Sequence, residues 1–159
     1  TDSFKTLDAI KQSRDLLNEA NAVAAANGLS LGFHNHWWEF QPVEGQAPYD
    51  VLLDGLDSSI FFELDTYWTK VAGADPVAWI KKLGPRVPLL HIKDGPGIQQ
   101  EPQVAAGEGI MDIPALIKAG EGQTEWLIVE LDRCATSMLE AVEKSFNYFA
   151  REGLGRGNK

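Results

Sequence analysis

Three side chains of the kinds that bind divalent metals come at or just past the ends of short apolar runs. They are Asp65, His91 and Glu130. In a parallel α/β fold the C-terminal ends of the strands meet at one rim, so these side chains would converge on one site. A mixed set that leans on carboxylates favours Mn²⁺, with Mg²⁺, Co²⁺ and Zn²⁺ as alternatives. The sequence therefore predicts a divalent-metal enzyme.

Each of these three residues also has a purely structural interpretation. Asp65 could cap the segment that follows it, His91 could be a hydrogen-bonded core histidine, and Glu130 could pair with a buried base. Three ionisable groups placed alike at successive strand ends are harder to explain in this way. Burying unpaired charge is costly and normally has a functional reason.

The fourth metal ligand stays open among three residues in and after the first apolar run. His34 lies at the end of the run, His36 follows two residues later, and Glu39 would have to fold back. Residues two apart on an extended strand point to the same side, where the two histidines could simply hydrogen-bond their neighbours. His34, His36 and Glu39 therefore all remain candidate ligands.

Polar and aromatic residues beside the expected ligands are candidates for substrate contact. Lys93 and Asp94 follow His91 closely, so either could hydrogen-bond a substrate hydroxyl or hold the ligand shell. A surface ion pair is the alternative for both. Trp38 and Trp68 offer flat faces that suit the apolar face of a sugar ring, and core packing is the alternative for each.

The elements that must position these residues alternate along the chain. Apolar runs predict strands over 29–33, 60–64, 87–92 and 126–131, and amphipathic patterns predict helices over 4–27, 49–56, 75–84, from 112, and over 137–151. A long loop, 94–108, is rich in Gly, Pro and Gln, as loops over active sites often are. This order is typical of a parallel sheet covered by helices.

The length of the chain limits the architecture to part of a barrel. An eight-stranded (β/α) barrel typically needs about 250 residues, whereas this chain has 159 residues and four predicted strands. We therefore expect a half barrel over 1–152, followed by a mobile glycine-rich tail over 153–159.

Charge and composition exclude several classes of partner. The formal net charge of −9 argues against nucleic acid and anionic membranes, because phosphate binding relies on clustered Lys and Arg. The sequence has no apolar run long enough to span a membrane, and its single cysteine cannot form an intrachain disulfide. An acidic cytoplasmic protein is the expectation.

With these residues assembled, the chain resembles the sugar phosphate isomerase/epimerase family of the xylose isomerase-like TIM barrel superfamily. The segments that carry the resemblance are Phe-His-Asn-His-Trp-Trp-Glu-Phe at 33–40, Glu-Leu-Asp-Thr-Tyr-Trp at 63–68, Ala-Gly-Ala-Asp-Pro at 72–76, Leu-His-Ile-Lys-Asp at 90–94, Gly-Glu-Gly at 107–109 and Ile-Val-Glu-Leu-Asp at 128–132.

The resemblance implies a C-terminal half barrel, made of strands five to eight, with a Glu, Asp, His, Glu metal set. Asp65, His91 and Glu130 match the second to fourth positions. His34 stands at the first, where Glu is usual, so either His34 is a ligand or Glu39 reaches back. The partner implied is a second copy, in a homodimer, or the missing N-terminal half barrel.

The activity implied is proton transfer next to the carbonyl of a sugar or sugar phosphate, through an enediolate that a divalent metal stabilises. Glu130 and either His36 or Glu39 would act as base and acid, with Lys93 also in the catalytic set. A 3-keto-sugar lyase or hydratase and a non-catalytic half barrel are the alternatives. A metal-dependent endonuclease of the superfamily fits poorly, because the chain is acidic and has only three histidines.

Overall fold

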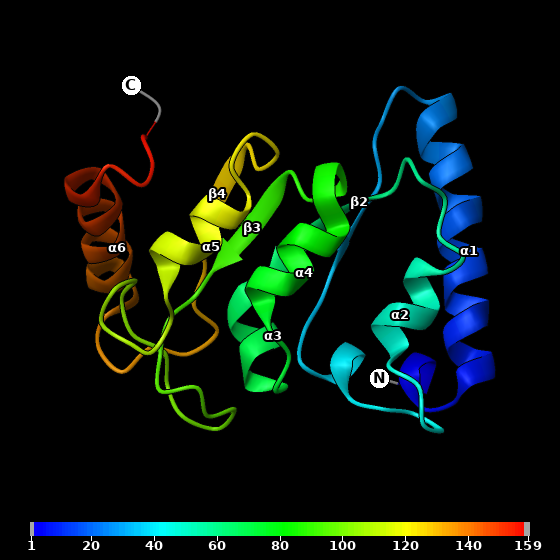
Figure 1. Ribbon diagram of the computed structural model, residues 1–159, viewed down its shortest axis with the longest axis horizontal. Coiled ribbons are helices and arrows are strands. Elements are labelled where there is room, and N and C mark those ends of the chain that lie inside the picture. The colour runs from blue at the N-terminus through cyan, green and yellow to red at the C-terminus, as the bar shows by residue number, and fades with distance from the viewer. Residues whose placement is uncertain (1, 158–159) are drawn as a thin grey trace.

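The computed structural model describes residues 2–157, in which helices alternate with four short parallel strands (Figure 1). The strands are β1 (Gly32–His34), β2 (Phe61–Asp65), β3 (Leu89–Ile92) and β4 (Trp126–Val129), and they pair in the order β1-β2-β3-β4. This confirms the predicted α/β class and the four-stranded parallel sheet of a partial barrel. Three of the strands are shorter than the apolar runs that predict them. Leu29, for example, is exposed ahead of β1.

Within residues 2–157, six α-helices connect and flank the strands. They are α1 (Leu7–Ala26), α2 (Pro48–Leu53), α3 (Thr66–Val71), α4 (Pro76–Leu83), α5 (Ile113–Ala119) and α6 (Met138–Glu152), together with 3₁₀ helices Asp2–Phe4, Trp38–Phe40 and Gly84–Arg86. Asp75 and Asp112 cap α4 and α5 by accepting from backbone N–H groups, as N-cap carboxylates do. Helix α3 was not predicted from the sequence.

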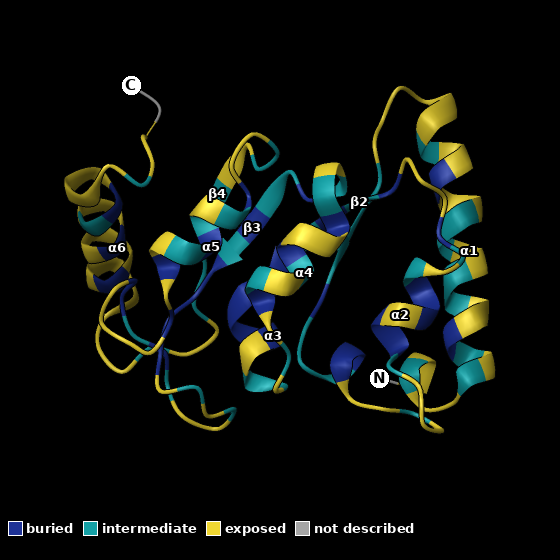
Figure 2. Cartoon of the chain, in the orientation of Figure 1, coloured by how far each residue is buried: buried dark blue, intermediate teal, exposed yellow. Residues whose placement is uncertain are grey.

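The two faces of the sheet differ in how far they are covered. Successive strand residues point to opposite faces, and Phe62, Leu64, Leu90 and Ile92 are fully buried on the outer face. Figure 2 shows buried and half-buried residues along β3. On the inner face Leu89 is only half-buried, and its neighbour in register, Trp126, is 53% exposed. The core of the molecule therefore lies between the outer face and the helices.

Helix α6 carries an apolar stripe that is largely exposed. Phe149 is buried, but Leu139, Val142 and Phe146 are exposed. A groove of about 980 Å³ runs between α5, β4 and α6, and Leu127, Phe146 and Phe149 are among the residues that line it. Val142, Phe146 and Phe149 of the stripe thus face an open groove beside β4.

The segment after α6 starts with a turn at Gly153. Gly153 ends α6 in the left-handed conformation, and Leu154 packs against the core. Residues 158 and 159 of the predicted tail lie outside the described residues, and the mobility of 153–159 stays a prediction.

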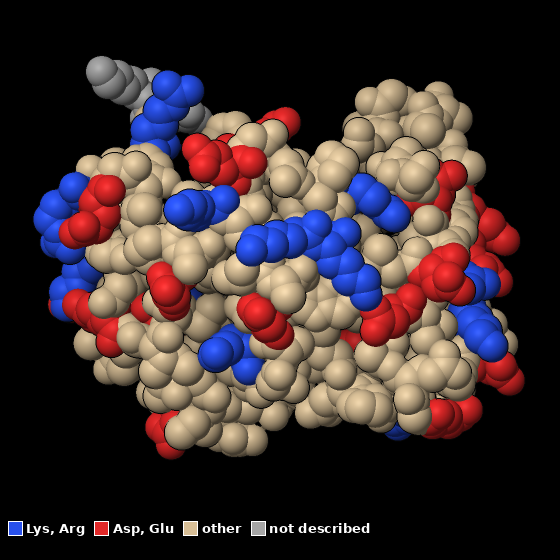
Figure 3. Space-filling view, in the orientation of Figure 1, with Lys and Arg blue, Asp and Glu red and all other residues tan. Residues whose placement is uncertain are grey.

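Surface charge and helix composition bear on the expected partners. Acidic and basic side chains are interspersed over the face that carries α4 and α5 (Figure 3). Within residues 2–157, no helix is both long and apolar enough to cross a bilayer.

Candidate metal centre

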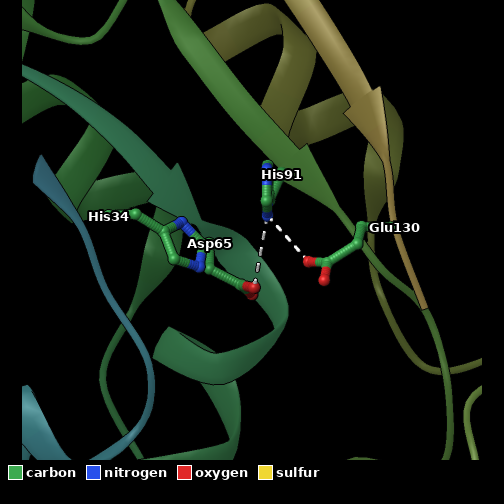
Figure 4. A group of neighbouring side chains, drawn as sticks. All are labelled: His34, Asp65, His91 and Glu130. Carbon is green, nitrogen blue, oxygen red and sulfur yellow. Dashed lines mark ion pairs between the residues drawn. The ribbon is translucent and has the colours of Figure 1, made fainter. Parts of the chain in front are cut away.

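Four side chains from the ends of the four strands meet on the inner side of the sheet (Figure 4). His34 ends β1, Asp65 ends β2, His91 is the third residue of β3, and Glu130 follows β4 directly. Their ligand-type atoms all lie within 4.8 Å of one another. Parallel pairing brings them together, because Asp65 and His91 are partners in register. The structure thus groups the three strand-end residues with His34.

Asp65 serves two purposes, one with each carboxylate oxygen. Oδ1 accepts a hydrogen bond from the backbone N–H of Trp68 at 2.8 Å and so caps α3. Oδ2 faces the site, 3.9 Å from His91 Nδ1. The side chain is fully buried, and this burial raises the pKa of Asp65 to about 6 despite the nearby Lys93. The capping interpretation and the ligand interpretation are therefore compatible.

His91 lies between two carboxylates. Its Nε2 is 2.9 Å from Glu63 Oε1, and its Nδ1 is 2.9 Å from Glu130 Oε2. A proton on Nε2 satisfies Glu63 and leaves Nδ1 with a lone pair directed at the site, which is the usual arrangement for a metal-binding histidine with an outer carboxylate. Glu63 was missed from the sequence, although its position two residues before Asp65 places it on the same face of β2.

His34 is oriented by the neighbouring strand. Its Nδ1 lies 3.2 Å from the carbonyl oxygen of Glu63, and since a carbonyl only accepts, Nδ1 carries the proton and Nε2 is left to bind a metal. Burial and the nearby His91 lower the pKa of His34, which keeps the ring neutral as a ligand must be.

Glu39 folds back, but toward the backbone rather than toward the metal group. It is buried, and its Oε2 accepts from the backbone N–H of His36 at 2.8 Å. The His36 ring stacks on Trp38 with centroids 4.1 Å apart, and it also contacts the ring of His34. Glu39 and His36 thus lie beside the four-residue group, outside it.

The two tryptophans predicted to meet substrate differ in setting. Trp38 is half-buried at the edge of the site through its stacking on His36. Trp68 belongs to the hydrophobic core, with the ammonium of Lys93 5.5 Å from its ring centroid. Trp38 is therefore the more accessible aromatic face.

Lys93 places an ammonium group among the carboxylates of the site. Its Nζ lies 3.0 Å from Asp65 Oδ2, 2.7 Å from Glu130 Oε2 and 2.8 Å from Asp132 Oδ2. Burial disfavours its charge, but these carboxylates outweigh burial and raise the pKa of Lys93. Because the side chain is only 1% exposed, the surface ion pair considered from the sequence is wrong for Lys93.

Asp94 points to the opposite face and holds the following loop. Its two oxygens accept hydrogen bonds from the backbone N–H groups of Gly95, Gly107, Gly109 and Met111. A side chain at Gly109 would collide with this carboxylate. Asp94 is also buried, so it forms no surface ion pair, and its oxygens are used in shaping the loop.

Two buried amides connect the site to its surroundings, and neither was predicted. Asn35 accepts from the backbone N–H of Asp65 at 3.0 Å and donates to its carbonyl at 3.3 Å, which fastens the end of β1 to β2. Gln103 donates to Asp132 Oδ2 at 3.0 Å and accepts from its backbone N–H at 2.7 Å. Because amide side chains do not ionise, nothing in the sequence indicated these roles.

The donor set fits a divalent cation. Within the described residues, Asp65 Oδ2, His91 Nδ1 and Glu130 Oε2 are buried atoms without a hydrogen bond of good geometry, although the Lys93 ammonium forms ion pairs with the two oxygens. The three atoms face one another. Buried acceptors that lack a hydrogen bond of good geometry are costly. One divalent ion would satisfy all three together with His34, and the mixed oxygen and nitrogen set suits Mn²⁺, Mg²⁺, Co²⁺ or Zn²⁺.

Comparisons with known proteins identify a family and related folds. The family model described as xylose isomerase-like TIM barrel matches residues 2–152. No curated protein sequence matches the chain. A crystal structure of a sugar phosphate isomerase/epimerase from Parabacteroides distasonis superposes with a TM-score of 0.81 and 28% identity, over 96% of this chain and 55% of that chain.

Two more distant structures share the fold. A structure of IOLI protein with a binding zinc atom has a TM-score of 0.70 and 19% identity, over 90% of this chain and 55% of that chain. A D-psicose 3-epimerase with D-fructose has a TM-score of 0.64 and 18% identity, over 93% and 57%. The chain thus spans little more than half the length of each of these structures.

Proposed function

Because the chain belongs to the xylose isomerase-like TIM barrel family, we propose that it carries the metal site of a sugar or sugar phosphate isomerase or epimerase. The observation that supports this most is the convergence of four ligand-type atoms within 4.8 Å at the strand ends. His34, Asp65, His91 and Glu130 would hold the ion, with Glu63 orienting His91 from behind. Mn²⁺ is the proposed metal.

A bound divalent ion would hold the carbonyl and hydroxyl oxygens of a keto-sugar and stabilise negative charge on them. Glu130, which is partly exposed, is the proposed base that removes the proton next to the carbonyl. His36 would return a proton from the other side, since its ring is partly exposed beside His34. The ammonium of Lys93 would stabilise a developing oxyanion.

Substrate would lie against Trp38, whose half-buried ring offers an apolar face for a sugar. Trp68 would contribute indirectly, by packing its ring against the ammonium of Lys93. In a 3-keto-sugar, the enolate formed by the same proton abstraction could eliminate a substituent from the adjacent carbon. Isomerase, epimerase and lyase reactions therefore share their first step.

Metal binding tests the site directly. We expect wild-type protein to bind Mn²⁺ in calorimetric titration, and Asp65→Asn and Glu130→Gln to weaken binding by more than about 100-fold, beyond the effect of an outer-shell partner. Asn at position 65 can still cap α3, so folding is retained. Asp112→Asn, the same change at the cap of α5, is the matched control. Unchanged affinity in Asp65→Asn would sink the assignment.

The shared chemical step has its own measurement. Incubation of keto-sugars with the Mn²⁺-loaded protein in D₂O should place deuterium on the carbon next to the carbonyl, as detected by NMR. Glu130→Gln should abolish this exchange. Metal binding without exchange on any keto-sugar would instead favour a non-catalytic half barrel.

A closed barrel is the proposed working form, assembled from two copies of this chain. Both β1 and β4 have a free edge in the four-stranded sheet, and the apolar groove beside β4 is open. Free edges and apolar faces favour association. Light scattering with and without Mn²⁺ should give a dimer mass. A monomer under both conditions would exclude the homodimer and leave a separate N-terminal half barrel as the partner.

A further inference from the structure

The proposed metal site already holds a positively charged side chain, Lys93. The Lys93 ammonium lies within 3.0 Å of Asp65 Oδ2 and Glu130 Oε2, which are two of the four proposed ligands. These are the same oxygens that have no hydrogen bond of good geometry. A divalent ion bound by these ligands would therefore compete with this ammonium for the same two oxygens.

A second anchor for the ammonium lies outside the ligand set. Lys93 donates a hydrogen bond to Asp132 Oδ2 at 2.8 Å. Asp132 is fixed by Gln103, whose amide bonds both its carboxylate and its backbone N–H. Gln103 in turn is buried and bonded through its backbone to the segment after β4. Asp132 can thus keep Lys93 paired when its contacts with Asp65 and Glu130 are lost.

We propose that Lys93 is an internal counter-cation that weakens and tunes metal binding, and that Asp132 is the anchor that draws it away from the ligands. The proposal rests on the proposed metal site. Without metal, Lys93 neutralises the buried carboxylates, which would otherwise repel each other. With metal, its positive charge beside the ion lowers affinity, so the ion can exchange.

Removing the ammonium should have opposite effects on the two states. Lys93→Met keeps most of the side-chain volume and should raise Mn²⁺ affinity about tenfold, which corresponds to about 1.4 kcal/mol. In the metal-free protein the uncompensated carboxylates should lower the melting temperature, so the shift in melting temperature on adding Mn²⁺ should grow. Lys81→Met, which removes an exposed lysine of α4, controls for net charge.

A double-mutant cycle tests the part played by Asp132. Asp132→Asn should weaken Mn²⁺ binding in the wild-type background, because Lys93 is then left with Asp65 and Glu130. In the Lys93→Met background the same change should have far less effect. An equal loss in both backgrounds would show that Asp132 acts through its own charge, and would overturn its assignment as an anchor.

The outcomes separate this inference from the proposed function. If wild-type protein binds Mn²⁺ and loses it in Asp65→Asn, the metal site stands. Should Lys93→Met then bind Mn²⁺ no more tightly than wild type, Lys93 is not a competing cation and the inference fails. If neither wild type nor Lys93→Met binds Mn²⁺, the metal site itself is refuted.

Discussion

The outer and inner faces of one sheet show how the same strands divide stability from chemistry. On β3 and just past its end, Leu90, Ile92 and Asp94 face outward, where the first two are buried in the core and the third holds a loop. His91 and Lys93 alternate with them and face the metal group. A period of two residues thus separates the two tasks, and each face can be altered while the other is kept.

The largest expected effect compares two adjacent leucines. Leu90→Ala should lower the free energy of unfolding by about 3 kcal/mol, because it opens a cavity in a fully buried core. Leu89→Ala on the half-buried inner face should cost about 1 kcal/mol. Urea denaturation of both variants measures the difference. Equal losses at low protein concentration would contradict the contrast between the faces.

A smaller effect is expected at the carboxylate behind His91. Glu63→Gln should weaken Mn²⁺ binding by roughly 10- to 100-fold, as loss of an outer partner of a metal-binding histidine does. Its cost to folding should stay within about 0.5 kcal/mol, because the side chain is partly exposed on the inner face. Calorimetry and urea denaturation report the two quantities. Glu143→Gln, at an exposed position of α6, is the control. If Glu63→Gln lowered stability as much as it lowered Mn²⁺ affinity, the prediction that Glu63 serves the metal site and not folding would be wrong.

The smallest effect concerns pH. Asp65 would bind a metal as a carboxylate, and burial raises its pKa to about 6. Mn²⁺ affinity should therefore fall as the pH drops below about 6, by up to about tenfold per pH unit for this one proton. Above about pH 7 this contribution should level off. Mn²⁺ titrations at a series of pH values from about 5 to about 8, which bracket the pKa of Asp65, test this prediction. An affinity that stays constant across this range would rule out Asp65 as a ligand.

The arrangement of the site could be predicted to the extent that it depends on strand ends. Asp65, His91 and Glu130 each follow an apolar run, and parallel pairing alone brings such positions together. The choice of His34 over Glu39 could not be made, because it depends on the 3₁₀ turn at Trp38–Phe40 and on the hydrogen bond that draws Glu39 to the backbone of His36.

What the sequence could not predict depends on contacts between distant residues. Helix α3 has only six residues, too few for a helical period to be recognised, and it is stabilised by the Asp65 cap. Asn35 lies 30 positions from its partner Asp65, and Gln103 lies 29 positions from its partner Asp132. The exposed stripe of α6 was predicted as a helix face, but its open groove depends on where the sheet stops.

The loop that Asp94 holds has a buried anchor at its base and exposed side chains at its tip. Four backbone N–H groups at its base converge on one carboxylate, whereas Ile98, Gln100 and Glu101 at the tip are exposed. Mutations at the tip break none of these bonds, so they are close to neutral for folding. The loop therefore separates a part that the fold requires, at its base, from a part whose side chains can be exchanged at little cost to folding, at its tip.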